Sequence, residues 1–198
     1  FHLSREETVR NASRFLKEAG AGAVKVEGAG PKRLKLVEAM VEAEIPVLGH
    51  VGLTPQSIHH LGQFKVRGKT LEEARRILDG AQDLERAGAF AVVLECIPQE
   101  LARLVTERLR VPTIGIGAGP HCDGQILVFH DLTGFTTGYL PKFVKKYLDL
   151  NGLLIRAVGD YARDVQRGSF PGEAHSYHLP AEERKALQTL IRKKGKRP

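Results

Sequence analysis

The sequence predicts an α/β protein built around a parallel sheet. Short runs rich in Val and Ile alternate with helical stretches along most of the 198 residues, and this alternation is typical of repeated strand–helix units. The apolar runs contain few charges, as strands covered on both faces require. Five such units fit two architectures: an open doubly wound sheet, or the last five strands of a (β/α)₈ barrel.

A helix is expected first, because Ser4 and Glu7 have the spacing of a capping box. The strands are then predicted over 23–27, 46–51, 90–97, 112–117 and 125–130. The helices between them are predicted over 31–43, 70–87 and 98–109, and later ones over 141–149, 151–168 and 181–193. A turn at 169–173 is expected to end the folded body, with residues 1–178 as the main domain and 179–198 as a basic helix or tail.

The amino-acid composition is that of a globular protein without a predicted membrane span. The chain is 42% hydrophobic and 27% charged, as in ordinary globular domains, and it has no apolar run of about 18 residues that would predict a membrane span. Only two cysteines occur, Cys96 and Cys122, which fits a reducing compartment and predicts a cytoplasmic location. Residues 181–198 carry +5 of the net charge of +7, and no aromatic residues are interleaved there, so no nucleic-acid partner is expected.

Charged residues interrupt the first predicted strand. Because side chains alternate along a strand, Lys25 and Glu27 share one face while Val24 and Val26 share the other. The pair is either exposed on an edge strand or directed into a site at the strand's carboxyl end, where barrel and open-sheet enzymes hold their reacting groups.

Two more polar residues interrupt apolar strands. Glu95 ends the run Ala91–Leu94, and a carboxylate in apolar surroundings is a stronger base than one in water. It is interpreted either as a general base or as a structural cap of the helix that follows Pro98. His50 ends another strand before a loop punctuated by glycine and proline, and it is either a site residue or a hydrogen-bonded structural histidine.

Two common site types are not predicted. The glycines at 115, 117 and 119 do not complete the G-x-G-x-x-G pattern, because Pro120 takes the last position, so dinucleotide binding is not expected. The two cysteines have no zinc-site spacing with any histidine.

Seven segments together resemble one family, the 3-methyl-2-oxobutanoate (ketopantoate) hydroxymethyltransferases. The two most specific are GHVGLTPQS at 49–57 and DGQILVFHD at 123–131. The others are VKVEG at 24–28, VLECIP at 93–98, IGIGAG at 114–119, PKF at 141–143 and FPGEAHS at 170–176. The resemblance runs in register from residue 1 to about 178.

The resemblance implies a (β/α)₈ barrel of the phosphoenolpyruvate/pyruvate superfamily. It also implies transfer of a hydroxymethyl group from 5,10-methylenetetrahydrofolate to 3-methyl-2-oxobutanoate, which gives 2-dehydropantoate for pantothenate and coenzyme A synthesis. Mg²⁺ is the implied cofactor, and a homo-oligomer, often a decamer, is the implied assembly. Carried over residue by residue, Glu95 matches the general base, Lys25 the ligand of the substrate carboxylate and Glu27 the metal ligand, and His50 is expected beside the substrate.

The family pattern begins earlier than this sequence does. The resemblance implies three preceding strand–helix units, with two aspartates of the metal site, that have no match here. The leading hypothesis is therefore a Mg²⁺-dependent hydroxymethyltransferase, and the alternative is a truncated, non-catalytic fragment that oligomerises. A lyase or mutase of the same superfamily and a folate-binding module without chemistry are further readings.

Overall fold

The computed structural model describes residues 3–57 and 65–193, with residue 57 and residues 188–193 described by backbone alone. Contacts divide the chain into two units, residues 1–147 and residues 148–198. The domain boundary expected at residue 178 stays a prediction.

The first unit contains a five-stranded parallel sheet, as predicted. Its strands pair in the order in which they follow one another along the chain. This order excludes the doubly wound alternative, in which the strand order reverses at a switch point, and matches consecutive units of a (β/α) barrel. The strands are β1 (Val24–Glu27), β2 (Val47–Gly52), β3 (Ala91–Glu95), β4 (Thr113–Ile116) and β5 (Gly124–Gln125).

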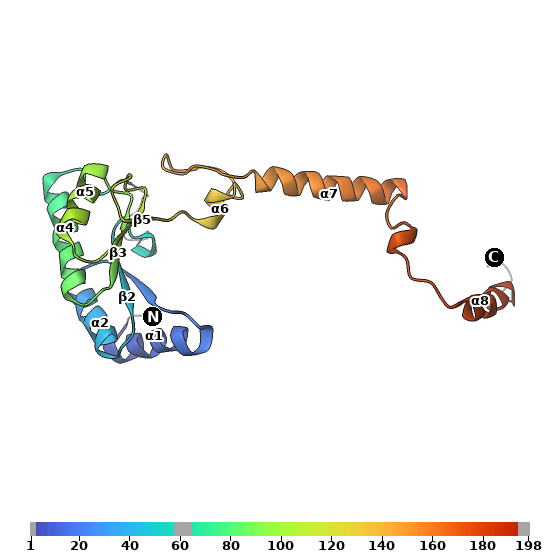
Figure 1. Cartoon of the computed structure of the whole chain (residues 1–198), viewed down its shortest axis with the longest axis horizontal. Coiled ribbons are helices and arrows are strands. Elements are labelled where there is room, and N and C mark those ends of the chain that lie inside the picture. Colours follow the sequence, from blue (N-terminus) through green and yellow to red (C-terminus); the bar gives the residue numbers. More distant parts are fainter. Residues whose placement is uncertain (1–2, 58–64, 194–198) are drawn as a thin grey trace. The chain divides into compact units, whose positions relative to one another are not determined.

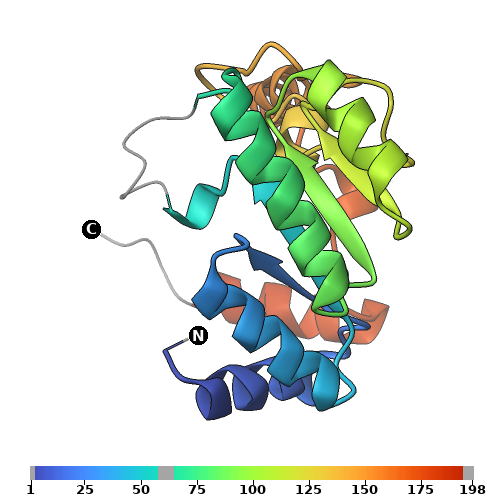
Figure 2. The same ribbon diagram turned by 90° about the vertical axis from the view of Figure 1, so that its left-hand side faces the viewer.

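Three helices cover one side of this sheet (Figures 1 and 2), namely α2 (Pro31–Glu42), α4 (Leu71–Arg86) and α5 (Gln99–Arg108). They match the predicted helices to within one residue. The first helix, α1 (Arg5–Ala19), begins as predicted, because the Ser4 hydroxyl accepts a hydrogen bond from the Glu7 N–H at 3.1 Å. Thr70 caps α4 in the same way through the Glu73 N–H. These caps satisfy N–H groups that have no partner within the helix.

Strand register separates the two faces of the sheet. Val26, Val47 and Leu94 are buried against α2 and α4 in a continuous apolar core, which is completed by residues such as Met40 and Leu84. The opposite face carries the polar side chains of β1, β2 and β3. The alternation predicted for β1 is therefore confirmed, since valine faces the helices and the charged residues face away from them.

Two predicted elements are wrong. The strand expected at 125–130 ends at Gln125, and α6 (Phe129–Leu132) follows within that range. Ile126, Val128 and Phe129 are exposed, so this apolar run is not the buried strand that its composition suggested.

The helix expected at 141–149 is also absent, and the segment forms turns and irregular backbone. The Phe143 ring packs against Gly117 at the end of β4. The next helix starts only after Asp149, whose non-helical backbone and side-chain bond to the Gly152 N–H cap it. Tertiary packing and this cap have overridden the local helical pattern.

The second unit consists of α7 (Leu150–Arg167), a 3₁₀ turn η2 (Glu173–His175) and α8 (Ala181–Lys193), close to the predicted ranges. No residue of α7 is buried. Between the two long helices, the Phe170 ring lies against Tyr161 and His175, with centroid separations of 5.6 and 5.0 Å. The turn predicted at 169–173 lies in this aromatic cluster.

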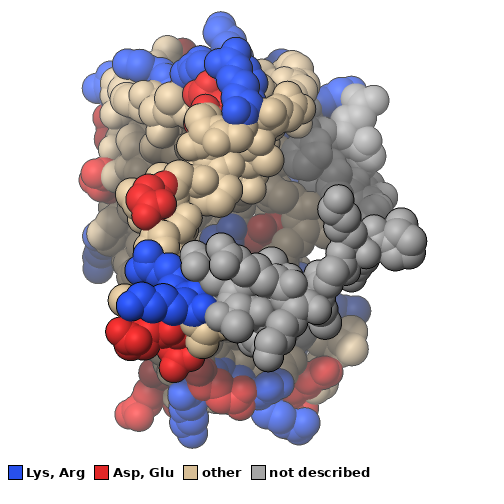
Figure 3. Space-filling view, turned by 90° about the vertical axis from the view of Figure 1, so that its right-hand side faces the viewer, with Lys and Arg blue, Asp and Glu red and all other residues tan. Residues whose placement is uncertain are grey.

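The surface carries charges of both signs (Figure 3). Several pair along exposed helices, such as Arg14 with Glu18 and Arg103 with Glu107, and exposed pairs of this kind each add little to stability. Among the described residues, no helix combines the length and the apolar character needed to cross a membrane.

Candidate active site at the carboxyl ends of the strands

Four of the predicted site residues lie on the face of the sheet that the helices leave open. Glu27 at the end of β1 pairs in register with His50 on β2, and Lys25 lies two residues earlier on the same face. His50 pairs in turn with Val93, and Gly52 with Glu95. Because the strands are parallel, their carboxyl ends meet, and residues far apart in the sequence come together there.

Glu27 is held by its neighbours. Its side chain is only 5% exposed, and burial of a carboxylate requires compensating partners. The Gln56 N–H donates to Oε2 at 2.9 Å, and the Lys25 Nζ lies 3.6 Å from Oε1. The exposed edge-strand alternative is therefore wrong for Glu27, whereas Lys25 remains partly exposed.

His50 lies between two carboxylates. Its side chain is completely buried, with Nε2 3.2 Å from Glu95 Oε2 and Nδ1 3.8 Å from Glu27 Oε1. Neither ring nitrogen makes a hydrogen bond to any described residue, because the nearby carboxylate oxygens lie too far away or out of line. Complete burial separates the ring from solvent, and the expected direct contact of His50 with the substrate stays a prediction.

Glu95 lies where β3 ends and the backbone turns sharply. Its carbonyl oxygen accepts a hydrogen bond from the Leu53 N–H at 2.8 Å, while its side chain is 15% exposed. The next residue, Cys96, has a φ of 53°, a left-handed conformation that is uncommon outside glycine and concentrates at functional sites. The helix-capping alternative is wrong, since no side chain caps the start of α5 at Pro98.

The Cys96 thiol lies next to Glu95 in the chain but is poorly suited to react. Burial raises its pKa above the usual value, and the neighbouring Glu95 raises it further, while Lys69 opposes both effects. A thiol with a raised pKa holds its proton at neutral pH and is a poor nucleophile. We therefore assign Cys96 no chemical role.

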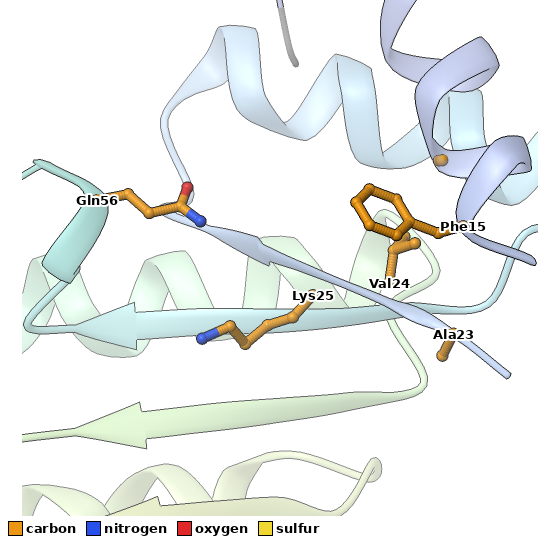
Figure 4. A pocket seen from close by; sticks show the side chains of 6 residues that line it. Phe15, Ala23, Val24, Lys25 and Gln56 are labelled. Atoms are coloured by element: carbon orange, nitrogen blue, oxygen red, sulfur yellow. The ribbon is translucent and has the colours of Figure 1, made fainter. Parts of the chain in front are cut away.

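Two hollows border the polar face. One, of about 320 Å³, is lined by Phe15, Val24, Lys25 and Gln56 among others; Figure 4 shows Lys25 extending along the sheet toward the strand ends, with Gln56 near the tip of β1. The other, of about 670 Å³, is lined by Glu27, Lys32 and Arg33 among others. Burial lowers the pKa of Arg33 while Glu27 opposes that effect, and the guanidinium stays charged at neutral pH.

Within the described residues, Glu27 is the candidate ligand for Mg²⁺. The described part of the chain contains no group of three His, Cys, Asp or Glu side chains able to hold a metal. Mg²⁺ is commonly bound through one or two carboxylates, with water and substrate oxygens completing its octahedron. Glu27, a carboxylate at the strand ends beside an open hollow, fits as one such ligand.

Three contributors were missed from the sequence. The backbone N–H of Gln56 holds Glu27, Gly52 permits the close approach of β2 to the Glu95 carbonyl, and Arg33 shares the second hollow with Glu27. A signal existed only for Gly52, because a glycine at the end of a strand often marks a position where another backbone approaches closely.

Comparison with known proteins supports the sequence resemblance. Residues 1–173 match the model of the family described as ketopantoate hydroxymethyltransferase. The chain is 52% identical over 182 residues to 3-methyl-2-oxobutanoate hydroxymethyltransferase of Syntrophomonas wolfei, covering 92% of this chain and 66% of that protein. It is 55% identical over 187 residues to the enzyme of the same name from Methylobacterium sp. strain 4-46, covering 94% and 64% respectively.

The chain thus spans about two thirds of the length of these relatives. A crystal structure of phosphonopyruvate hydrolase aligns with 96% of this chain and 66% of its own, at 14% identity and a TM-score of 0.47. The family model, which covers most of the chain, and the identity of about one half decide the assignment. This chain belongs to the ketopantoate hydroxymethyltransferase family.

Proposed function

We propose that this chain transfers a hydroxymethyl group from 5,10-methylenetetrahydrofolate to 3-methyl-2-oxobutanoate, giving 2-dehydropantoate. The observation that carries the proposal is the convergence of Lys25, Glu27 and Glu95 on one open face at the strand ends. The names of its relatives supply the reaction and the oxoacid. The folate donor, the metal and the residue roles are our proposals from the chemistry of the site.

The first step is removal of a proton from C3 of the oxoacid. In the proposal, a Glu95 carboxylate oxygen takes this proton, and the C–H electron pair becomes part of an enolate. Glu95 suits the role because its carboxylate lies at the carboxyl end of β3, on the same face of the sheet as Lys25 and Glu27, and is only 15% exposed.

The second step forms the new carbon–carbon bond. The enolate carbon attacks the methylene carbon of the folate, and one of the two carbon–nitrogen bonds of that methylene group breaks, its nitrogen taking the proton that Glu95 removed. A water molecule then displaces the second nitrogen, which supplies the hydroxyl oxygen of the product and a proton to the tetrahydrofolate that is released. Lys25 orients the oxoacid by pairing with its carboxylate, as its partly exposed ammonium group permits.

Glu27 is the proposed ligand of Mg²⁺. When bound, Mg²⁺ would polarise the ketone and stabilise negative charge on the enolate. The Gln56 N–H bonds to Oε2 of Glu27, which would leave Oε1 to hold the cation. Lys25, 3.6 Å from Oε1, then turns toward the substrate carboxylate.

Deuterium exchange at C3 tests the proposal without folate. Proton NMR in D₂O should show loss of the C3 proton signal of 3-methyl-2-oxobutanoate, faster with Mg²⁺ than without it. Glu95→Gln should slow this exchange by at least about 100-fold, the lower range for removal of a general base. Glu100→Gln, on the exposed first turn of α5, is the matched control and should exchange at the wild-type rate.

Absence of exchange from the folded wild-type protein would refute the proposed activity and favour a non-catalytic member of the family. The homo-oligomer and the cytoplasmic location stay predictions. Multi-angle light scattering measures the first directly, and fluorescence imaging of the tagged protein measures the second.

A further inference from the structure

His50 is the most deeply buried polar group of the site, and no step above uses it. Its side chain has no exposed surface, yet it is flanked by the carboxylates of Glu27 and Glu95, one beside each ring nitrogen. A histidine whose role was only to fill the core would be expected to bond to the backbone or to another structural group. Neither ring nitrogen does so among the described residues.

The two carboxylates are not equivalent partners. Nε2 lies 3.2 Å from Glu95 Oε2, a separation within reach of a hydrogen bond, whereas Nδ1 lies 3.8 Å from Glu27 Oε1, beyond that reach. Glu27 is also held already by the Gln56 N–H. Glu95 has no other partner for its side chain among the hydrogen bonds and ion pairs of the described residues, so it is the carboxylate that the imidazole can orient.

The side chain that can move is Glu95. The imidazole is enclosed on β2, an interior strand of the sheet, while the Glu95 carboxylate is partly exposed at the end of β3. The two atoms are within hydrogen-bond distance but out of line, and catalytic hydrogen bonds often align fully only when the reacting complex forms.

We propose that His50 is a positioning residue that holds the base. Its Nε2–H donates to Glu95 Oε2 and leaves Oε1 directed at the C3 proton of the oxoacid. The buried ring then acts on the substrate only through Glu95, in place of the direct contact expected from the sequence. This inference rests on the function proposed above, because it assigns the residue that orients the general base.

Three substitutions of His50, which keep the position of one ring nitrogen or of neither, separate this role from simple packing. The amide nitrogen of His50→Gln can reach the position of Nε2, that of His50→Asn only the position of Nδ1, and His50→Leu supplies neither. In the Mg²⁺-dependent exchange assay we expect kcat of the Leu and Asn variants to fall about 100-fold with KM nearly unchanged, as for a misplaced catalytic group. The Gln variant should stay within about 10-fold of wild type.

Thr113→Val is the control for lost stability. Thr113 is as deeply buried as His50 but lies two strands away, at the start of β4, where its side chain faces α5 and bonds to Thr106 and Asp123. Its loss should lower the unfolding midpoint while kcat stays at the wild-type value. A purely structural role of His50 would instead make the three His50 variants lose activity in proportion to their loss of stability.

A spectroscopic measurement makes the inference independent of turnover. Long-range ¹H–¹⁵N correlation spectra of the histidine rings should show the proton of His50 on Nε2, and Glu95→Ala should shift the Nε2 resonance more than that of Nδ1. A proton on Nδ1, a wild-type kcat in His50→Leu, or rescue by Asn and not by Gln would each overturn the proposal. Exchange by the wild-type protein, measured first, separates such a failure from failure of the proposed function.

Discussion

Gly52 ends β2 beside Glu95, the proposed general base, and its replacement by alanine should damage both stability and activity. Gly52 has a φ of 97°, which L side chains rarely adopt. A Cβ built there overlaps the backbone carbonyl oxygen of Glu95 and lies 2.8 Å from the Cγ2 of Ile97. Neither neighbour can yield easily, because the first is backbone and the second is a buried core side chain.

The magnitude follows from these contacts. The backbone conformation costs alanine about 1–2 kcal/mol, and overpacking against Ile97 costs roughly 1–3 kcal/mol. Displacement of the Glu95 carbonyl also breaks its hydrogen bond with the Leu53 N–H, 2.8 Å long, for about 1 kcal/mol. We therefore expect Gly52→Ala to lower the free energy of unfolding by about 4 kcal/mol.

Gly138→Ala is the matched control. Its φ of 95° is almost the same, but a Cβ there meets nothing within 4 Å, so only the conformational cost of about 1–2 kcal/mol applies. Urea unfolding followed by circular dichroism at 222 nm should separate the two variants by about 1 M in midpoint, given slopes of about 2 kcal/mol per M. C3 exchange should fall about 100-fold in Gly52→Ala, because Glu95 moves. Equal destabilisation by the two substitutions would refute the argument.

Three further predictions concern single side chains. Lys25→Met should raise KM for 3-methyl-2-oxobutanoate about 10- to 100-fold, since a charge-assisted hydrogen bond contributes about 1.5–3 kcal/mol; steady-state exchange rates against oxoacid concentration measure this, and an unchanged KM would contradict the role of Lys25. Asp123→Asn should lower the unfolding midpoint but not the exchange rate, because Asp123 Oδ2 accepts hydrogen bonds from the N–H and hydroxyl of buried Thr113. Thermal unfolding and C3 exchange, measured in parallel, check this, and a loss of exchange at temperatures where the variant is folded would contradict it. Alkylation of Cys96 by iodoacetamide at pH 7, followed by mass spectrometry, should be slower than alkylation of glutathione, because burial raises the pKa of the Cys96 thiol. The thiol of the unfolded chain loses its proton at a lower pH than the thiol of the folded chain. The stability that Cys96 contributes is therefore complete below the pKa of the unfolded thiol and is lost as pH rises through the pKa of the folded thiol.

Local patterns predicted most of the scaffold. Val24–Val26 and Ala91–Leu94 alternate or run apolar in ways that only a buried strand satisfies, and Ser4 marks a helix start through its own side chain. The pattern failed at 125–130 and 141–149. In the first, apolar residues remain exposed after Gln125; in the second, the capping of α7 by Asp149 and the packing of Phe143 on Gly117 decide the backbone.

The site shows the same division. Charged residues on apolar strands were the sequence signal that made Lys25, Glu27 and Glu95 candidates, because a charge is costly to bury without a partner. The sequence carried no signal for the Gln56 N–H that holds Glu27, since any residue supplies a backbone N–H.

By itself, the sequence determined the α/β class, which residues of each strand share a face, and the charged residues from which a site could be built. These features depend on alternation and residue type, which act within a few positions of the chain. Only the tertiary structure decided that the strands pair in chain order, that His50 lies buried between Glu27 and Glu95, and that Gly52 meets the Glu95 carbonyl. The physical reason is that these contacts join residues 10 to 45 positions apart along the chain. Strand pairing, which no local pattern contains, sets which of these residues meet.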